Sequence, residues 1–87
     1  MKKIRWDPKK SQLIQTNPNR GLSLELIADL IQAGSVLSIE TRNNYPDQKA
    51  FVVPIEEEVW CVPFREEDDQ IFLITAWPDR KLKKKYR

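Results

Sequence analysis

The sequence predicts an α+β protein in which two N-terminal helices pack on a mainly antiparallel sheet of four to five strands, followed by a basic C-terminal tail. Apolar residues recur at helical spacing between residues 24 and 31, and four strand-like runs follow between residues 36 and 77. Short connections join these runs, which favours antiparallel neighbours because tight turns can link such strands. A chain of 87 residues has room for one domain, so we assign residues 1–87 to it.

The N-terminal elements are predicted from signals at their ends. Residues 4–6 have the composition of a short strand. Asp7 followed by Pro8 is typical of a helix start, because the aspartate accepts a hydrogen bond from a free backbone N–H and the proline presets φ. We expect this helix to reach about Thr16 and to lie on the surface, because it has few apolar residues.

The second helix carries a strongly apolar face. Ser23 is a favourable N-cap and Gly34 a favourable end, and the apolar residues between them follow a helical period. This helix must pack on another element, and the strands that follow provide the available surface.

Four strands are expected at residues 36–41, 49–55, 59–64 and 71–77. The last three are apolar on both faces, whereas two helices cover one face of a sheet. We therefore expect the other face to be partly buried by the tail, by another subunit or by a partner. Pro54 and Pro63 lie inside expected strands, which predicts bulges or positions outside the ladder of backbone hydrogen bonds.

Charge is distributed unevenly along the chain. The net charge is +2, but residues 1–20 carry six basic side chains and one acidic one, residues 21–78 carry three and eleven, and residues 79–87 carry six and one. Two basic ends therefore flank an acidic middle. If the fold brings both ends to one surface, that surface would attract a polyanion.

Residue usage argues against several kinds of site. The chain has no histidine and a single cysteine, Cys61, so neither a zinc site of the usual nitrogen and sulfur type nor catalysis by a histidine base is expected. The acidic runs at residues 56–58 and 66–69 lack the pattern of a calcium loop and are typical of solvated turns. We therefore expect no metal and no cofactor.

The expected compartment is the cytoplasm. No apolar run approaches the roughly 20 residues that cross a bilayer, and the basic N-terminus lacks the apolar segment of a secretory signal. We expect no contact with a membrane.

The C-terminal tail is the first candidate for function. Six of the residues 79–87 are cations and Tyr86 lies among them, a composition that suits phosphate contacts combined with base stacking. A solvated terminus that keeps the protein soluble would have the same composition. Trp77, at the end of the last expected strand, is the tryptophan best placed to face a ligand. The candidate binding residues are Trp77, Lys83, Lys84, Lys85, Tyr86 and Arg87.

Three short motifs, in the correct order along the chain, resemble those of BrnT-type toxins. They are Trp6-Asp7-Pro8 with Lys10, Gly21-Leu22-Ser23-Leu24-Glu25, and Arg80-Lys81, which are similar to the family's W-D-x-x-K, G-[IV]-S-F-E and A-R-K-A-T. These toxins are small ribonucleases of type II toxin–antitoxin systems with a RelE-like fold. Arg20 stands where the family has a histidine, which indicates a divergent member.

The resemblance implies a metal-independent endoribonuclease that cleaves RNA, with Lys10, Arg80 and Lys81 at catalytic positions. Arg65 lies at the end of the third of the four expected strands, and its residue type suits either a phosphate clamp or an ordinary loop cation. In this interpretation Arg65 and Arg80 hold the scissile phosphate, and Lys81 or Lys10 stabilises the leaving oxygen. A lysine or Tyr86 would serve as the base, and both stay open.

Two other functions stay open beside the toxin. One is a non-catalytic RNA-binding module of the same fold, and the other is a protein-interaction module whose tail only confers solubility. The expected partners are RNA and a cognate antitoxin protein, which would cover the cationic surface. A homo- or hetero-oligomer is a further expectation, because a second apolar sheet face needs cover.

Overall fold

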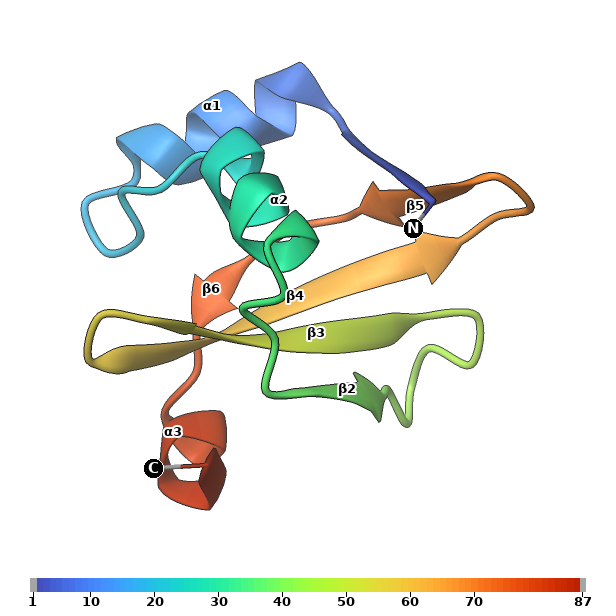
Figure 1. Cartoon of the computed structure of the whole chain (residues 1–87). Coiled ribbons are helices and arrows are strands. Elements are labelled where there is room, and N and C mark those ends of the chain that lie inside the picture. Colours follow the sequence, from blue (N-terminus) through green and yellow to red (C-terminus); the bar gives the residue numbers. More distant parts are fainter. Residues whose placement is uncertain (1, 87) are drawn as a thin grey trace.

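The observed helices and strands match the predicted ones near the N-terminus and differ from them near the C-terminus (Figure 1). The computed structural model describes residues 2–86, and within them it contains three helices and a mixed sheet of six strands. Their bounds are β1 Lys3–Trp6, α1 Pro8–Thr16, α2 Leu24–Gln32, β2 Ser38–Thr41, β3 Lys49–Ile55, β4 Glu58–Glu66, β5 Gln70–Leu73, β6 Trp77–Pro78 and α3 Arg80–Tyr86. The predicted α+β class is confirmed.

Helices α1 and α2 begin at the residues that the sequence indicates. The side chain of Asp7 accepts a backbone N–H of the first turn of α1 at 2.9 Å, and that of Ser23 accepts one from α2 at 3.1 Å. The buried hydroxyl of Ser11 accepts a further hydrogen bond from the backbone N of Leu24 at 2.9 Å, which fixes the start of α2 against α1. No helix among residues 2–86 has the length and apolar character needed to cross a membrane.

The sheet has the order β1-β5-β4-β3-β2, and β6 pairs with the start of β4. Strands β2 to β5 follow one another along the chain and pair antiparallel. β1 pairs in parallel with β5. Two helices separate β1 from the next strand in the chain. No hairpin therefore forces β1 to pair antiparallel. Four of the five strand pairings are antiparallel, as expected. The expected four to five strands are corrected to six, and the pairing of β1 with β5 makes the sheet mixed.

The strand expected at residues 71–77 is divided into β5 and β6, which both pair with β4. Between the pairs Phe64↔Leu73 and Cys61↔Trp77, β4 contributes two residues and the partner segment contributes three. One residue of that segment is therefore bulged out of the ladder. The prediction of a single long strand was wrong, because the apolar character of a segment does not show where its register changes.

The two prolines lie where the ladder needs no N–H from them. The carbonyl of Pro63 accepts from Ile74 N at 2.9 Å, so its missing N–H faces the same bulged segment. The carbonyl of Val52 accepts from Leu37 N and faces β2. Pro54 faces the same way two residues later, beyond the last residue of β3 that pairs with β2. Both predicted alternatives are therefore observed: Pro63 faces a bulge, and Pro54 lies outside the ladder of hydrogen bonds with β2.

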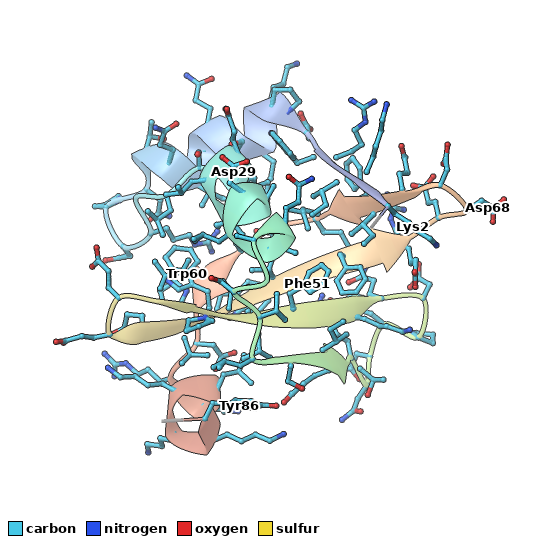
Figure 2. The ribbon with its side chains drawn as sticks, viewed as in Figure 1. Lys2, Asp29, Phe51, Trp60, Asp68 and Tyr86 are labelled. Atoms are coloured by element: carbon cyan, nitrogen blue, oxygen red, sulfur yellow. The ribbon has the colours of Figure 1, made fainter. Side chains whose placement is uncertain are left out.

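The main hydrophobic core lies between the sheet and the pair α1 and α2, on what we call the first face. Phe51 and Phe64 stack there, with ring centroids 4.1 Å apart. Figure 2 shows Phe51 and Trp60 on the side of α2. The buried core residues are Ile4, Ile14, Leu24, Ile27, Ala28, Ile31, Phe51, Val53, Trp60, Val62, Phe64, Ile71, Leu73 and Ala76.

The second face is the opposite side of the sheet, and it carries the alternate residues of the same strands, such as Val52 and Cys61. Helix α3 lies on this side, away from α1 and α2 (Figure 1). The sequence left open whether the tail, another subunit or a partner covers this face. The tail, as α3, covers part of it. A surface that is built partly by the C-terminus is thus placed beside the sheet.

Candidate nucleic-acid interface

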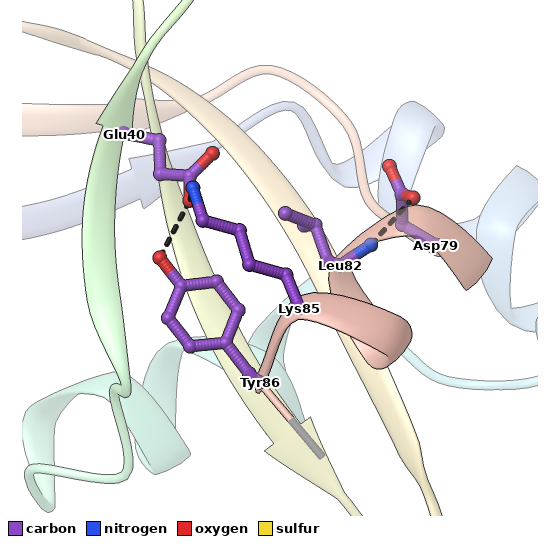
Figure 3. A network of polar contacts seen from close by, with 5 residues as sticks. All are labelled: Glu40, Asp79, Leu82, Lys85 and Tyr86. Atoms are coloured by element: carbon purple, nitrogen blue, oxygen red, sulfur yellow. Dashed lines mark hydrogen bonds and ion pairs between the residues drawn. The ribbon is translucent and has the colours of Figure 1, made fainter.

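Helix α3 is tied to the sheet at its first turn by Asp79. One carboxylate oxygen, Oδ1, accepts from the backbone N of Lys81 at 2.9 Å. It also accepts from the backbone N of Leu82 at 3.2 Å (Figure 3). The backbone N of Asp79 donates to the carbonyl of Val59, at the start of β4, at 2.8 Å. Asp79 therefore caps α3 and also fixes its position along β4.

The far end of α3 is held by Glu40 on β2. Tyr86 Oη donates to Glu40 Oε2 at 2.5 Å, and Lys85 Nζ donates to the same oxygen at 2.8 Å (Figure 3). The hydrogen bond from Lys85, followed by that from Tyr86, lowers the pKa of Glu40, and the same contact raises the pKa of Lys85. Lys83 Nζ lies 3.1 Å from Glu58 Oε1. Part of the basic tail is therefore used to dock α3.

A groove of about 430 Å³ lies between α3, the loop after β2 and the second face. Its floor consists of Ala50, Val52 and Cys61, and Trp77 and Leu82 also line it. Burial, followed by the charge of Asp79, raises the pKa of the Cys61 thiol to about 11. This thiol stays neutral near physiological pH and serves as a small apolar residue rather than as a nucleophile.

Arg42 also lines this groove, beside two aromatic rings. Its guanidinium carbon lies 4.4 Å from the centroid of the Tyr45 ring and 5.7 Å from that of Trp77. Its Nη1 donates to Gln48 Oε1 at 2.7 Å, and Trp77 Nε1 donates to Asp79 Oδ2 at 3.3 Å. The cation and the two rings therefore lie next to one another at the groove, where Tyr45 is exposed and Arg42 and Trp77 are half-buried.

Sequence reasoning missed Arg42, which lies between the strands expected at residues 36–41 and 49–55. The available signal was local: Arg42 and Tyr45 lie in one short loop with Asn43 and Asn44 between them. The contact of Arg42 with Trp77 depends on the pairing of β6 with β4, which the sequence pattern does not show.

The structure places the predicted catalytic residues in three regions. Lys81 lines the groove and Arg80 is exposed next to it at the start of α3. Lys10 lies on α1, on the other side of the sheet. Arg65 lies on the second face, with its guanidinium carbon 5.5 Å from the Phe72 ring centroid. It is four residues along β4 from Cys61, which corresponds to about 13 Å. The four cations are therefore not one cluster.

The predicted binding residues also divide into groups. Trp77 lines the groove, and Lys84 is exposed on α3. Lys83, Lys85 and Tyr86 contact carboxylates of the sheet. Arg87 lies outside the described residues.

None of the groups with a shifted pKa is suited to act as a general base at neutral pH. The pKa is lowered for Glu40 and for Glu66, whose main partner is Lys2, and raised for Lys85 and Cys61. Each of these shifts moves away from neutrality, and a general base works best with a pKa close to the working pH. Among residues 2–86, no group of three or more histidine, cysteine or acidic side chains is arranged to hold a metal ion.

Comparisons with known proteins found no family model, no curated protein and no solved structure that matches this chain.

Proposed function

We propose that this chain binds single-stranded RNA in the groove between α3 and the second face. The observation that carries the proposal is Arg42, whose guanidinium lies over the rings of Tyr45 and Trp77 at the edge of the groove. Arginine binds phosphate oxygens, and an aromatic ring stacks on any unpaired base. This combination suits a single strand better than a duplex, in which the bases are already stacked.

Charges near the groove support the same function. Lys81 lines it, Arg80 precedes Lys81, and Lys84 follows on α3. None of the three side chains takes part in an ion pair within residues 2–86. Cations in this position replace the counterions of a phosphate backbone, so the affinity should fall as salt is added.

Fluorescence anisotropy with a labelled oligouridylate of about 12 nucleotides tests this proposal. Binding should weaken as KCl is raised from about 50 to about 200 mM. Arg42→Ala should weaken binding about ten-fold, because it removes charge-assisted phosphate contacts. Lys9→Ala is the matched control, since it removes the same charge from an exposed position on α1. Equal affinities for both variants, or binding that salt does not affect, would contradict the proposal.

Ribonuclease activity of the type II toxin class is the second candidate. It is supported by the order of the three motifs in the sequence, and by the position of the last of them, Arg80-Lys81, beside the groove. In this proposal a cognate antitoxin protein is the partner, and it covers the groove and the exposed cations Arg80, Lys81 and Lys84. RNA binding without cleavage is the alternative within the same fold.

The groove can supply part of the chemistry of cleavage. Attack by the 2′-OH of RNA needs positive charge at the phosphate and proton transfer at two oxygens. Arg42 and Lys81 line one groove and would supply the charge. The hydroxyl of Tyr86 donates to Glu40, which favours a lysine as the proton acceptor. That lysine would have to be unprotonated and different from Lys81, which supplies positive charge in this proposal.

The test of cleavage uses single-stranded RNA in the presence of EDTA. The wild-type protein should cleave it, and Arg80→Ala or Lys81→Ala should abolish both cleavage and toxicity on expression. Binding without cleavage would leave the RNA-binding function alone. A small copurifying protein, with no affinity for RNA, would instead favour the protein-interaction module.

A further inference from the structure

A row of two arginines and one aromatic ring crosses the second face away from α3. Phe72 on β5 pairs with Arg5 on β1 and with Arg65 on β4. Their chain neighbours Ile4 and Ile71 belong to the core of the first face. Because side chains alternate along a strand, Arg5, Phe72 and Arg65 all point to the second face.

This row is open to a ligand. Phe72 is half-buried, and both arginines are exposed. Arg65 lies over the Phe72 ring at 5.5 Å, whereas α3 packs on the first half of β4 and leaves this end of the face uncovered. Within the described chain neither arginine takes part in an ion pair. The acidic loop at residues 66–69 borders the row and limits how far a polyanion could extend.

We propose that Arg5, Phe72 and Arg65 form a second nucleotide subsite for the same RNA strand that occupies the groove. A base stacks on the ring of Phe72, and Arg65 moves from the ring to a neighbouring phosphate, which Arg5 contacts from the other side. Stacking of a base on an aromatic ring contributes more binding free energy than an exposed cation–π contact. Replacing Arg65 by a base on the Phe72 ring is therefore favourable.

Geometry favours one continuous strand. The subsite and the groove lie on one face, about 13 Å apart along β4 by the rise of a strand, a span that a few nucleotides cover. An open sheet face with an aromatic ring between cations is also the arrangement by which sheet proteins read unpaired bases. This inference rests on the proposed RNA-binding function and extends its site.

The experiment compares a uridine trinucleotide with an oligouridylate of about 12 nucleotides by anisotropy. Phe72→Leu and Arg65→Ala should each weaken binding of the longer RNA about five-fold or more, and should leave the trinucleotide, which occupies the groove, unchanged. Lys9→Ala is the control for a lost charge. Thermal melts show whether Phe72→Leu folds, and Arg65→Ala changes an exposed residue, so it tests the subsite independently.

Abasic nucleotides at one end of the longer RNA separate stacking from charge. With this probe the effect of Phe72→Leu should disappear, whereas that of Arg65→Ala should persist. If the longer RNA binds, Arg42→Ala weakens it, and both subsite variants bind like wild type, the subsite is wrong and the proposed function stands. If the longer RNA does not bind the wild-type protein, the proposed function itself fails.

Discussion

The two faces of the sheet are closed by different physical means. The first face is closed by fully buried apolar side chains of α1 and α2, such as Ile14, Leu24 and Ile27. The second face is closed in part by α3, which has no buried residue among Arg80–Tyr86 and is held by a cap, hydrogen bonds and ion pairs. Stability should therefore reside mainly on the first face, and binding on the second, where polar groups remain accessible.

The largest effect is expected from a cavity on the first face. Ile27 is fully buried, so Ile27→Ala should lower the free energy of unfolding by about 2 to 5 kcal/mol. Leu82→Ala, at a half-buried position of α3, should cost clearly less. Chemical denaturation measures both variants, and an equal loss would contradict the contrast between the faces.

The next effect is expected at the cap of α3. Asp79→Ala removes the acceptor of two backbone N–H groups and of the Trp77 indole, which should cost about 1 kcal/mol and release the first turn of α3. Denaturation and amide hydrogen exchange measure the two consequences. Asp47→Ala, an exposed aspartate in a loop, is the control, and an equal effect there would exclude a capping role.

A smaller effect is expected from acid. The pKa of Glu40 in the folded protein lies below its ordinary value of 4.5, mainly because of Lys85. The contacts of Glu40 therefore stabilise the docked α3 fully above pH 4.5, and this contribution is lost as the pH falls through the lowered pKa. NMR signals of the Tyr86 ring should follow this titration, and Glu40→Gln should remove it. A Tyr86 signal that titrates unchanged in Glu40→Gln would contradict the assignment.

The smallest effect is expected from the ion pair between Lys83 and Glu58. Both side chains are more than one third exposed, at 41% and 45%, so solvent screens their attraction. Lys83→Ala should change the free energy of unfolding by about 0.5 kcal/mol or less. A loss comparable to that of Asp79→Ala would mean that ion pairs, rather than the cap, hold α3.

Local signals in the sequence predicted the parts of the fold that depend on neighbouring residues. Asp7 and Pro8 set the start of α1, and β3 has the predicted bounds Lys49–Ile55. The parallel pairing of β1 with β5 and the division of the last strand depend on contacts between distant segments. No local pattern contains that information.

The candidate site was predicted only in part, because it also depends on contacts between distant segments. Trp77 and Lys81 do line the groove. The sequence treated the tail as one cationic surface, but Lys85 and Tyr86 contact Glu40, more than forty residues away. Arg42 was missed because its aromatic partners are brought to it by the sheet.

The central claim is that RNA binds at the second face beside Arg42. The three tryptophans of the chain provide separate indole N–H signals by NMR, and they sample different parts of the fold: Trp60 lies in the core of the first face, Trp6 packs against that core, and Trp77 lines the groove. Titration with oligouridylate should shift the signal of Trp77 and leave those of Trp60 and Trp6 in place. Shifts confined to Trp6 or Trp60, or no shift at Trp77 when RNA is bound, would contradict the account.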